Sequence, residues 1–343
     1  MDKLLTVKDV AGYLQMSKEK VYKLAQQGKI PVSRIENQWR FRQGKLNAWL
    51  EANELGSISV IPHTISLQVP AKAEPFLKWA GGKGQLLRQY EPYFPEKFNN
   101  YLEPFVGGGA VFFHLYNTGR LNNGKRIILM DSNAELVSCY HVIKENVRQL
   151  INLLSSSKFA NSEKVFYKIR AEEPTDKIER AARTIYLNKT CFNGLYRVNS
   201  KGKFNAPFGR YKNPAICNSA NIHAVSNALQ NVEIICADFV ACLEFAKKGD
   251  FIYFDPPYQP LNKTSSFTSY TKDSFNGEHQ ERLSEVYRTL DKRGCRVMLS
   301  NSDTRFIAKL YSGFKIKKVL AKRVINCKAS GRGEITELVI LTY

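Results

Sequence analysis

Residues 101–112 carry the sequence YLEPFVGGGAVF, and this stretch decides the fold class of the chain. A short apolar run leads to three consecutive glycines, and a second apolar run follows directly. This order predicts a buried strand, a tight turn and a helix, the repeating unit of an α/β domain. Apolar strand patterns continue to alternate with helical patterns over residues 74–343. We therefore expect a mainly parallel α/β sheet covered by helices.

The glycine turn is also a candidate ligand site. In open α/β sheets, ligands lie outside the carboxyl ends of the strands, at turns of this kind. The dinucleotide pattern GxGxxG does not fit, because its sixth position is Phe112, and the chain has no Walker A loop. The turn therefore disfavours a nicotinamide-dependent enzyme or a nucleoside triphosphatase.

A second glycine-containing segment precedes this turn. Residues 76–83 read FLKWAGGK. Paired glycines let the backbone approach a ligand closely, and Lys83 offers a positive charge to a carboxylate. Taken alone, this string is also compatible with an ordinary turn.

Two further strand patterns each end in an acid. Asp131 closes the first, and its carboxylate suits a pair of ribose hydroxyls. Capping of the helix that starts near Asn133 explains Asp131 nearly as well. Asp238 closes the second strand, where it suits an adenine amine. Phe239 suits either stacking on that base or packing in the hydrophobic core.

Residues 250–258, with the sequence DFIYFDPPY, form the most specific string in the chain. The residue types of this string suit methylation of the exocyclic amine of adenine. That amine is a poor nucleophile, because its lone pair is delocalised into the ring. Asp255 and the backbone carbonyl of Pro256 can accept N–H bonds from it, and the proline rings aim that carbonyl in advance. Tyr258 can stack on the base, which must first leave the duplex. We therefore predict in-line methyl transfer without a metal; a strand that leaves through a Pro-Pro turn is the structural alternative.

FLKWAGGK, YLEPFVGGGAVFF, Asp131 and YFDPPY, in this order, resemble the Dam-like DNA adenine-N6 methyltransferases over about residues 75–343. The resemblance implies a Rossmann-like fold that uses S-adenosylmethionine and releases S-adenosylhomocysteine. It also implies a helical target-recognition insertion at about residues 150–225. The residues expected to contact the cofactor are Trp79, Lys83, Glu103, Phe105, Gly107, Asp131, Asp238, Phe239 and Asp255.

Basic, amide and aromatic residues interleave over residues 188–212, as a DNA-reading loop requires. By resemblance, Phe192 wedges into the base stack and Arg197 grips a guanine edge. Family members usually carry Tyr where Phe192 stands, so stacking is retained and a hydroxyl contact is lost. The loop resembles the group that reads GATC or another site beginning with GAT. The residues expected to contact DNA here are Lys78, Phe192, Asn193, Leu195, Arg197 and Pro207.

Residues 1–53 form a separate unit in the sequence. Thr6 can cap a first helix, and Ser17 can cap a second helix that stops at Gly28. A basic β-wing with a turn at residues 36–37 and a last helix at about 43–51 complete the pattern. It resembles the excisionase-like and MerR-like winged helix-turn-helix modules, which place the second helix in the major groove of DNA. The DNA-contacting residues that we expect on this helix are Lys18 and Lys20.

The alternative for this unit is a small helical domain that only docks proteins. Residues 54–73 hold no helical period, and we interpret them as a linker to the larger domain at 74–343.

Composition sets further bounds on function. The 343 residues carry a formal net charge of +20, which favours double-stranded DNA or another polyanion as partner. The seven cysteines form no CxxC pair, so we expect buried small hydrophobes in a reducing compartment. The five histidines lack the spacing of zinc hydrolases or deaminases. No apolar run of about 18 residues and no signal peptide is present, and we expect a cytoplasmic, monomeric protein without membrane contact.

Three other functions compete with this one. RNA and protein N-methyltransferases more often carry Asn-Pro-Pro-Tyr, whereas this chain has Asp255. A cytosine-C5 enzyme needs a Pro-Cys nucleophile, and no Pro-Cys pair occurs. A regulator whose methylase-like half only binds DNA is disfavoured by the intact set of motifs. A cognate restriction endonuclease as partner and the role of the N-terminal unit stay open.

Overall fold

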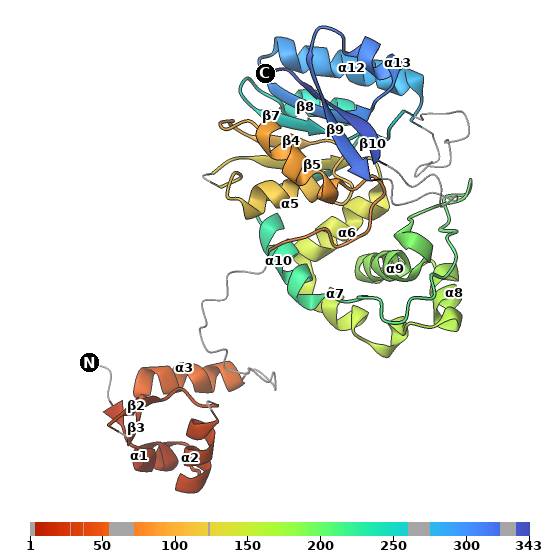
Figure 1. The fold of residues 1–343 in the computed structure, drawn as a ribbon. Helices are drawn as coiled ribbons and strands as arrows, with labels where there is room; N and C mark the ends of the chain where they lie inside the picture. The colour runs from red at the N-terminus through yellow and green to blue at the C-terminus, as the bar shows by residue number, and fades with distance from the viewer. Residues whose placement is uncertain are drawn as a thin grey trace. The chain divides into compact units, whose positions relative to one another are not determined.

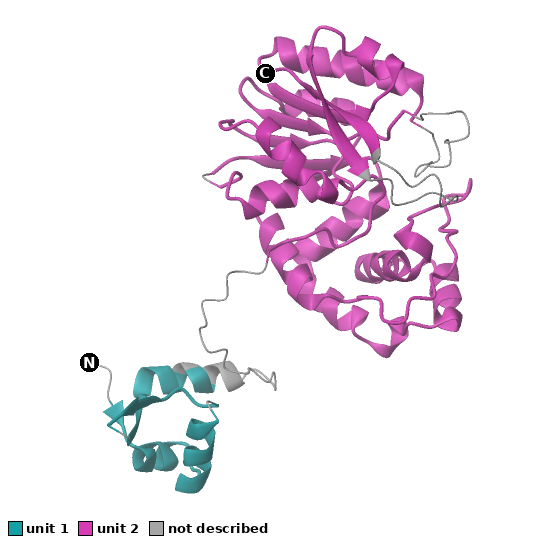
Figure 2. Cartoon of the chain, in the orientation of Figure 1, with its two compact units in different colours: residues 1–69 teal, residues 70–343 magenta. Residues whose placement is uncertain are grey.

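The computed structural model describes residues 4–27, 29–36, 38–54, 72–122, 124–259, 275–322 and 334–343. The chain divides into two compact units, residues 1–69 and 70–343, which are described separately below (Figure 2). Most of the predicted linker, residues 55–71, lies outside the described residues. Among the described helices, none has the length and apolar character needed to span a bilayer.

The N-terminal unit is a helix-turn-helix with a β-wing. Its elements are β1 (Leu4–Leu5), α1 (Val7–Tyr13), α2 (Lys18–Gln26), β2 (Ser33–Ile35), β3 (Gln38–Arg42) and α3 (Gln43–Glu54). Thr6 caps α1 in a capping box with Asp9, and Ser17 caps α2, as predicted. The predicted stop of α2 at Gly28 lies outside the described residues. The predicted order of helices and wing is confirmed.

Two details of this unit differ from the prediction. The unpredicted strand β1 pairs with β3, with Leu5 opposite Phe41, and makes a three-stranded sheet of order β1-β3-β2. The last helix, α3, runs three residues past the expected end at Glu51. β1 adds Leu5 to a small core, in which Val10, Val21 and Phe41 are fully buried. A short unit buries little apolar surface, so this extra strand pairing helps to close its core.

A seven-stranded sheet forms the centre of the larger unit (Figure 1). Its order is β6-β5-β4-β7-β8-β10-β9, and the first five strands are parallel. β10 is antiparallel to both β8 and β9. The predicted α/β class with a mainly parallel sheet is thus confirmed. The strands are β4 (Tyr101–Glu103), β5 (Ile127–Asp131), β6 (Val232–Cys236), β7 (Phe251–Phe254), β8 (Arg296–Ser302), β9 (Lys315–Lys322) and β10 (Glu334–Leu341).

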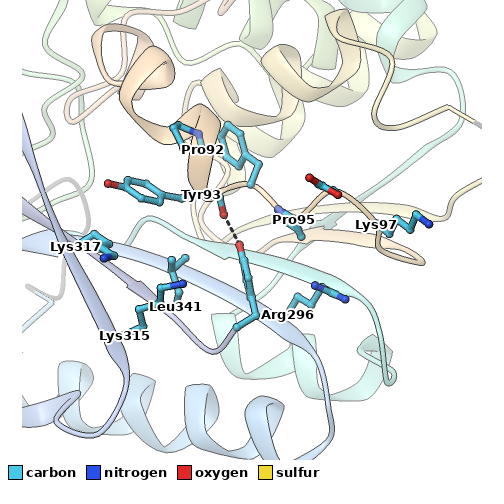
Figure 3. A pocket seen from close by; sticks show the side chains of 11 residues that line it. Pro92, Tyr93, Pro95, Lys97, Arg296, Lys315, Lys317 and Leu341 are labelled. Atoms are coloured by element: carbon cyan, nitrogen blue, oxygen red, sulfur yellow. Dashed lines mark hydrogen bonds between the residues drawn. The ribbon is translucent and has the colours of Figure 1, made fainter.

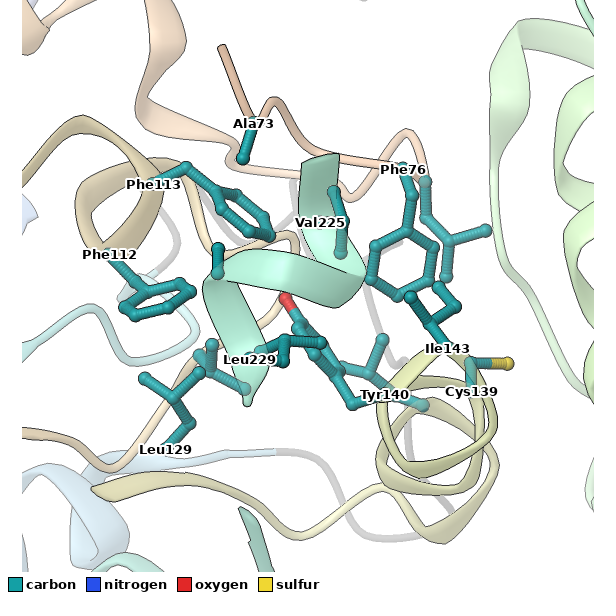
Figure 4. Close-up of a cluster of buried hydrophobic side chains, with 14 of the residues drawn as sticks. Ala73, Phe76, Phe112, Phe113, Leu129, Cys139, Tyr140, Ile143, Val225 and Leu229 are labelled. Atoms are coloured by element: carbon teal, nitrogen blue, oxygen red, sulfur yellow. The ribbon is translucent and has the colours of Figure 1, made fainter. Parts of the chain in front are cut away.

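Helices cover both faces of this sheet, because its strands bury side chains on both sides. In β5, Leu129 points into one core cluster, and Ile128 and Met130 point into the other. Figure 4 shows the first cluster, where Leu129 lies near Phe112 and Tyr140. The first cluster includes residues of α4 (Leu87–Tyr90), α5 (Ala110–Asn117), α6 (Ala134–Glu145) and α10 (Ser219–Leu229), and it continues into the helical segment that follows α6. The second cluster includes residues of α11 (Cys242–Phe245), α12 (Gly277–Lys292) and α13 (Arg305–Leu310).

A helical segment separates α6 from α10. It contains α7 (Val147–Leu154), α8 (Glu163–Ala171) and α9 (Lys177–Thr190), and α9 contacts α6, α7 and α8. Figure 1 shows these helices together beside the sheet. A loop follows α9 and closes on itself through isolated bridges from Cys191 to Phe208 and from Val198 to Phe204. These elements lie within the range predicted for the target-recognition insertion.

The cysteine prediction is wrong at two of the described positions. Cys139, Cys191, Cys242 and Cys295 are buried, as expected for small hydrophobes, whereas Cys217 is half-buried and Cys236 is exposed. Cys236 ends β6, which is the outermost strand on its side of the sheet, so no neighbouring strand covers it there. Cys327 lies outside the described residues.

Candidate active site

One large cavity, of about 810 Å³, lies at the carboxyl ends of β4, β5, β6 and β7. All nine residues predicted to contact the cofactor line it, as do Pro256, Tyr258 and Lys78. The carboxyl ends of neighbouring parallel strands meet at one edge of the sheet, so residues far apart in sequence converge there. The cavity therefore gathers the predicted cofactor residues and the predicted catalytic residues in one place.

The glycine turn lets an aromatic side chain pack directly on the backbone. Gly107 has a φ of +48°, and a Cβ atom there would lie only 2.8 Å from Cδ1 of Trp79. The amide of Gly107 donates a hydrogen bond to Asp131 Oδ2 at 3.1 Å. Trp79 in turn stacks on Tyr196, with ring centroids 5.3 Å apart. A glycine at this position thus joins the FLKWAGGK segment to the turn that follows β4.

Asp131 holds the cavity wall together from the end of β5. Besides the Gly107 amide, its carboxylate accepts a bond from the amide of Asn133 at 2.9 Å. The cap of α6 is Asn133 itself, whose Oδ1 accepts from the amide of Leu136 at 3.1 Å. The alternative in which Asp131 caps the helix is therefore wrong. Desolvation raises the pKa of Asp131 to about 6, although both backbone bonds oppose that shift.

Asp238 and Phe239 follow β6 and meet α12. Asp238 accepts from the amide of Val240 at 3.0 Å and forms an ion pair with Arg282, also at 3.0 Å. Phe239 is 3% exposed and stacks on Phe105, with 5.4 Å between ring centroids. It belongs to a core cluster, as one of the two expectations had it, and it also lines the cavity; its stacking on a base stays a prediction.

Glu103 is a buried acid at the end of β4. It is 2% exposed and accepts a hydrogen bond from the hydroxyl of Tyr101 at 2.7 Å. Burial raises the pKa of Glu103 to about 8, and the Tyr101 bond opposes the shift. At neutral pH, most copies of this carboxyl group therefore keep their proton and can donate it in a hydrogen bond.

Asp255 sits directly after β7, at the centre of the cavity. Its Oδ1 atom forms an ion pair with Nζ of Lys83 at 2.8 Å. The same oxygen accepts a bond from the hydroxyl of Ser300, on β8, at 2.8 Å. Burial raises the pKa of Asp255, and Lys83 is the main opposing influence. Lys83, itself only 4% exposed, thus supports a charged Asp255.

Side chains from distant elements hold the residues after Asp255. Gln280 of α12 donates to the carbonyl of Pro257 at 2.9 Å. Tyr258 donates from its hydroxyl to Oε2 of Glu337, on β10, at 2.7 Å. Asn301 Oδ1 accepts from the amide of Gln259 at 3.3 Å. Side chains from α12, β10 and β8 therefore hold three consecutive residues, Pro257, Tyr258 and Gln259.

Four of these residues belong to no motif recognised in the sequence: Ser300, Asn301, Gln280 and Glu337. One available signal was the run Ser300-Asn301-Ser302, in which three polar residues end an otherwise apolar strand. All three are buried. Buried polar side chains need partners, so a polar run at a strand end indicates a nearby site.

Five of the predicted DNA-contacting residues lie outside the cavity, in the loop after α9: Phe192, Asn193, Leu195, Arg197 and Pro207. Phe192 is 54% exposed, and its amide donates to the carbonyl of Pro207 at 2.8 Å, which joins the two halves of the loop. Asn193 is exposed, with a φ of +57°. Arg197 is also exposed and donates to the side chain of Asn205 at 2.7 Å. Leu195 is half-buried beside them.

Lys78 connects this loop with the cavity. Asn188, buried on α9, accepts from the amide of Lys78 at 2.9 Å and donates to its carbonyl at 2.8 Å. The same Asn188 amide donates to the carbonyl of Gly194 at 3.0 Å. From the sequence, Asn188 was only the first residue of the stretch predicted to read DNA. Its burial shows a structural role, because a buried amide side chain needs hydrogen-bond partners.

A second pocket, of about 560 Å³, lies at the amino ends of β8 and β9 (Figure 3). Exposed cations line it, among them Arg296, Lys315 and Lys317. β9 is an edge strand, and lysines on such a strand discourage pairing with other chains. None of the predicted site residues lies there, so the cavity at the carboxyl ends remains the candidate active site.

In the N-terminal unit, Lys18 and Lys20 are exposed on α2, as predicted. Among the described residues, no group of three or more His, Cys, Asp or Glu side chains is arranged to hold a metal ion.

Comparison with known proteins identifies two families in the chain. Residues 79–325 match the D12 class of N6 adenine-specific DNA methyltransferases. Residues 4–54 match a helix-turn-helix domain.

Individual relatives agree with the first match over most of the chain. The type II methyltransferase M.MjaIII of Methanocaldococcus jannaschii is 50% identical over 291 residues, which are 79% of this chain and 100% of that protein. M1.LlaDCHI of Lactococcus lactis subsp. cremoris, also named a type II methyltransferase, is 44% identical over 78% of this chain and 95% of its own length. A DNA adenine methylase of Haemophilus influenzae is 36% identical over 82% and 97%.

The predicted enzyme class and the resemblance to Dam-like proteins are thus confirmed. The chain belongs to the D12 class of N6 adenine-specific DNA methyltransferases, and it carries an N-terminal helix-turn-helix domain.

Proposed function

We propose that the chain transfers the methyl group of S-adenosylmethionine to N6 of an adenine that has been flipped out of duplex DNA, within a GATC site. The observation that carries this proposal is the position of Asp255 at the end of β7, inside a cavity of about 810 Å³. A cavity of this volume has room for a nucleoside cofactor beside a single base.

The chemistry of the cavity wall fits S-adenosylmethionine. When bound, this cofactor supplies an electrophilic methyl group on a positively charged sulfur. In this proposal, Asp131 accepts ribose hydroxyls and Asp238 accepts the cofactor's adenine amine. The rings of Phe239 and Phe105 offer an apolar surface for that base. Trp79, Lys83, Glu103 and Gly107 also line this wall.

The DPPY residues prepare the amine of the target adenine. Asp255 accepts one N–H bond, and the carbonyl of Pro256 accepts the other. Gln280 bonds the neighbouring carbonyl of Pro257, and no partner for the Pro256 carbonyl occurs within the described residues. Two acceptors favour a more tetrahedral nitrogen, whose lone pair then points at the methyl group. Tyr258 stacks on the flipped base.

The loop after α9 supplies target recognition in this proposal. Phe192 is exposed and apolar, as a wedge between base pairs must be. Arg197 is also exposed, and in this proposal it exchanges its bonds to Asn205 for a guanine edge. The finer assignment to GATC rests on the resemblance of residues 188–212. A different site that contains GAT is the main alternative.

Two digestions test the recognition sequence. Plasmid is prepared with this chain or its Asp255→Ala variant in cells that lack adenine methylation. It is then cut with an endonuclease blocked by methylated GATC and with one that requires it. We expect resistance to the first and cleavage by the second with the unaltered chain alone. Unchanged cutting in both digests rejects GATC.

Single-molecule sequencing of the same plasmids separates the two parts of the proposal. Methylated adenine in another sequence context would leave the chemistry in place and replace the recognition site. Absence of methylated adenine from every context, with folded protein present, would reject the proposed activity.

The N-terminal unit is expected to add affinity for DNA. Lys18 and Lys20 lie exposed on α2 and can contact phosphates, which makes the binding salt-dependent. A monomeric state and a cognate restriction endonuclease stay predictions.

A further inference from the structure

Glu337 is a buried acid that belongs to no motif of the sequence. It lies on the antiparallel strand β10, 79 residues after Tyr258, and is 8% exposed. Its side chain lines the cavity, and its Oε2 atom accepts the hydroxyl proton of Tyr258 at 2.7 Å. A strand at the far side of the sheet thereby reaches the last residue of the DPPY motif.

Two charged groups fix the ring of Tyr258 from different directions. Glu337 holds the hydroxyl, and Nζ of Lys83 lies 4.6 Å from the ring centroid. A carboxylate acceptor makes a stronger hydrogen bond than a neutral one and raises the electron density of the ring. Lys83 also forms an ion pair with Asp255, so the same ammonium group contacts both the acid and the aromatic ring of the DPPY motif.

Packing of β10 does not explain a carboxyl group at this position. The next four residues, Leu338 to Leu341, are apolar and buried, and residue 337 shares its side of the sheet with Val339 and Leu341. A leucine at position 337 would suit this strand. Burying an acid costs free energy unless its bonds repay that cost. The bond to Tyr258 is therefore the feature that a carboxylate provides here.

Ser300 supports Asp255 through a side-chain hydrogen bond, as Glu337 supports Tyr258. It lies opposite Val339 in the register of β8 and β10, and Glu337 lies opposite Ser302. Ser300 and Glu337 thus face the same side of the sheet, two positions apart along the strands. Ser300 holds Asp255, and Glu337 holds Tyr258. The two neighbouring strands together orient both ends of the DPPY motif.

We propose that Glu337 is a positioning residue for methyl transfer, which holds the ring of Tyr258 in the orientation that stacks on the target adenine. The inference rests on the proposed role of Tyr258. Glu337 itself touches neither substrate in this proposal, and it acts through the hydroxyl of Tyr258 alone.

A double-mutant cycle tests the proposal on the full chain. The variants are Glu337→Leu, Glu337→Gln, Tyr258→Phe and the double variant Tyr258→Phe/Glu337→Leu. The control is Thr336→Val, which changes the neighbouring residue of β10 on the opposite face of the sheet. kcat and KM for DNA and for the cofactor are measured, together with the melting temperature of each variant.

We expect Glu337→Leu to lower kcat roughly 10- to 100-fold, the rate equivalent of one charged hydrogen bond. KM for the cofactor should stay within about twofold, because the bond holds a residue that faces the base. Glu337→Gln keeps an acceptor and should return kcat to within roughly fivefold of the unaltered chain. In the Tyr258→Phe background, Glu337→Leu should have little further effect, because the bond is already absent.

Three results overturn the inference. These are an unchanged kcat in folded Glu337→Leu, an unchanged kcat in Tyr258→Phe, and a full additional loss from Glu337→Leu in the Tyr258→Phe background. Tyr258→Phe breaks the bond without altering β10, so the second result remains decisive even when Glu337→Leu folds poorly. Asp255→Ala, measured alongside, distinguishes the two proposals: full activity in that variant rejects the proposed function itself.

Discussion

The two ends of the cavity are built in different ways. At the nucleoside end, Asp131 ends β5 and Asp238 follows β6, and each accepts a bond from the backbone amide two residues further along. Each also has one distant partner, the Gly107 amide for Asp131 and the Arg282 side chain for Asp238. At the catalytic end, Asp255 and Tyr258 are held by side chains from β8 and β10, 45 and 79 residues further along the chain. The nucleoside end thus combines local backbone bonds with two distant contacts, whereas the catalytic end depends on distant side chains and exists only once the whole sheet has formed.

This difference predicts where substitutions act. Changes at the nucleoside end should weaken cofactor binding and leave the rate of the chemical step nearly intact. Changes at the catalytic end should lower that rate and leave cofactor binding nearly intact.

The largest expected effect is that of Asp255→Ala. Removing an acceptor aimed at the reacting amine should lower kcat by roughly a thousandfold, the upper range for one group that stabilises a transition state. Binding of duplex DNA, measured by gel shift, should change by less than about threefold, because the predicted DNA contacts lie in the loop after α9. Substantial turnover in this variant would remove Asp255 from the catalytic role.

Asp131→Asn should produce a smaller effect of the other kind. The amide keeps one acceptor for the backbone but loses the charge that favours two ribose hydroxyls. We expect KM for the cofactor to rise about tenfold, with kcat within roughly twofold. Isothermal titration with the cofactor product gives an independent affinity. A loss confined to kcat would contradict the division of the cavity into two ends.

Ser300→Ala tests the distant support of Asp255. The serine hydroxyl lowers the pKa of Asp255, and Lys83 lowers it more strongly. Loss of the hydroxyl should therefore raise that pKa further, so that the charged acceptor is lost at a higher pH. We expect the acid limb of the kcat profile to move to higher pH and kcat at neutral pH to fall by about threefold. An unmoved acid limb would exclude this role for Ser300.

Glu103→Gln should affect stability most visibly through its pH dependence. The pKa of Glu103 rises from 4.5 to about 8 on folding. The folded state therefore binds a proton more tightly than the unfolded state, and stability declines as pH rises from about 4.5 to about 8. The melting temperature should decline less steeply with rising pH over this range for Glu103→Gln than for the unaltered chain. If the two plots of melting temperature against pH run parallel, burial does not raise the pKa of Glu103.

The same contrast explains which features were predictable. Strand-end acids and glycine turns are signals within a few residues, and Asp131, Asp238 and Asp255 all reached the cavity as expected. Glu337 and Ser300 gain their meaning only from the pairing of β8 with β10, which an apolar strand pattern does not specify. The antiparallel direction of β10 was unpredictable for the same reason. Even the ion pair of Lys83 with Asp255 joins segments that only the sheet brings together.

Asn188 has a consequence for how the two substrates influence each other. One amide side chain binds the backbone of Lys78 and the carbonyl of Gly194, so the cofactor segment and the DNA loop share a single anchor. If the loop shifts on DNA as proposed, we expect Asn188 to pass that shift to the backbone that leads to Trp79. Thermodynamic linkage makes such coupling reciprocal: whatever factor DNA applies to the affinity for the cofactor, the cofactor applies to the affinity for DNA.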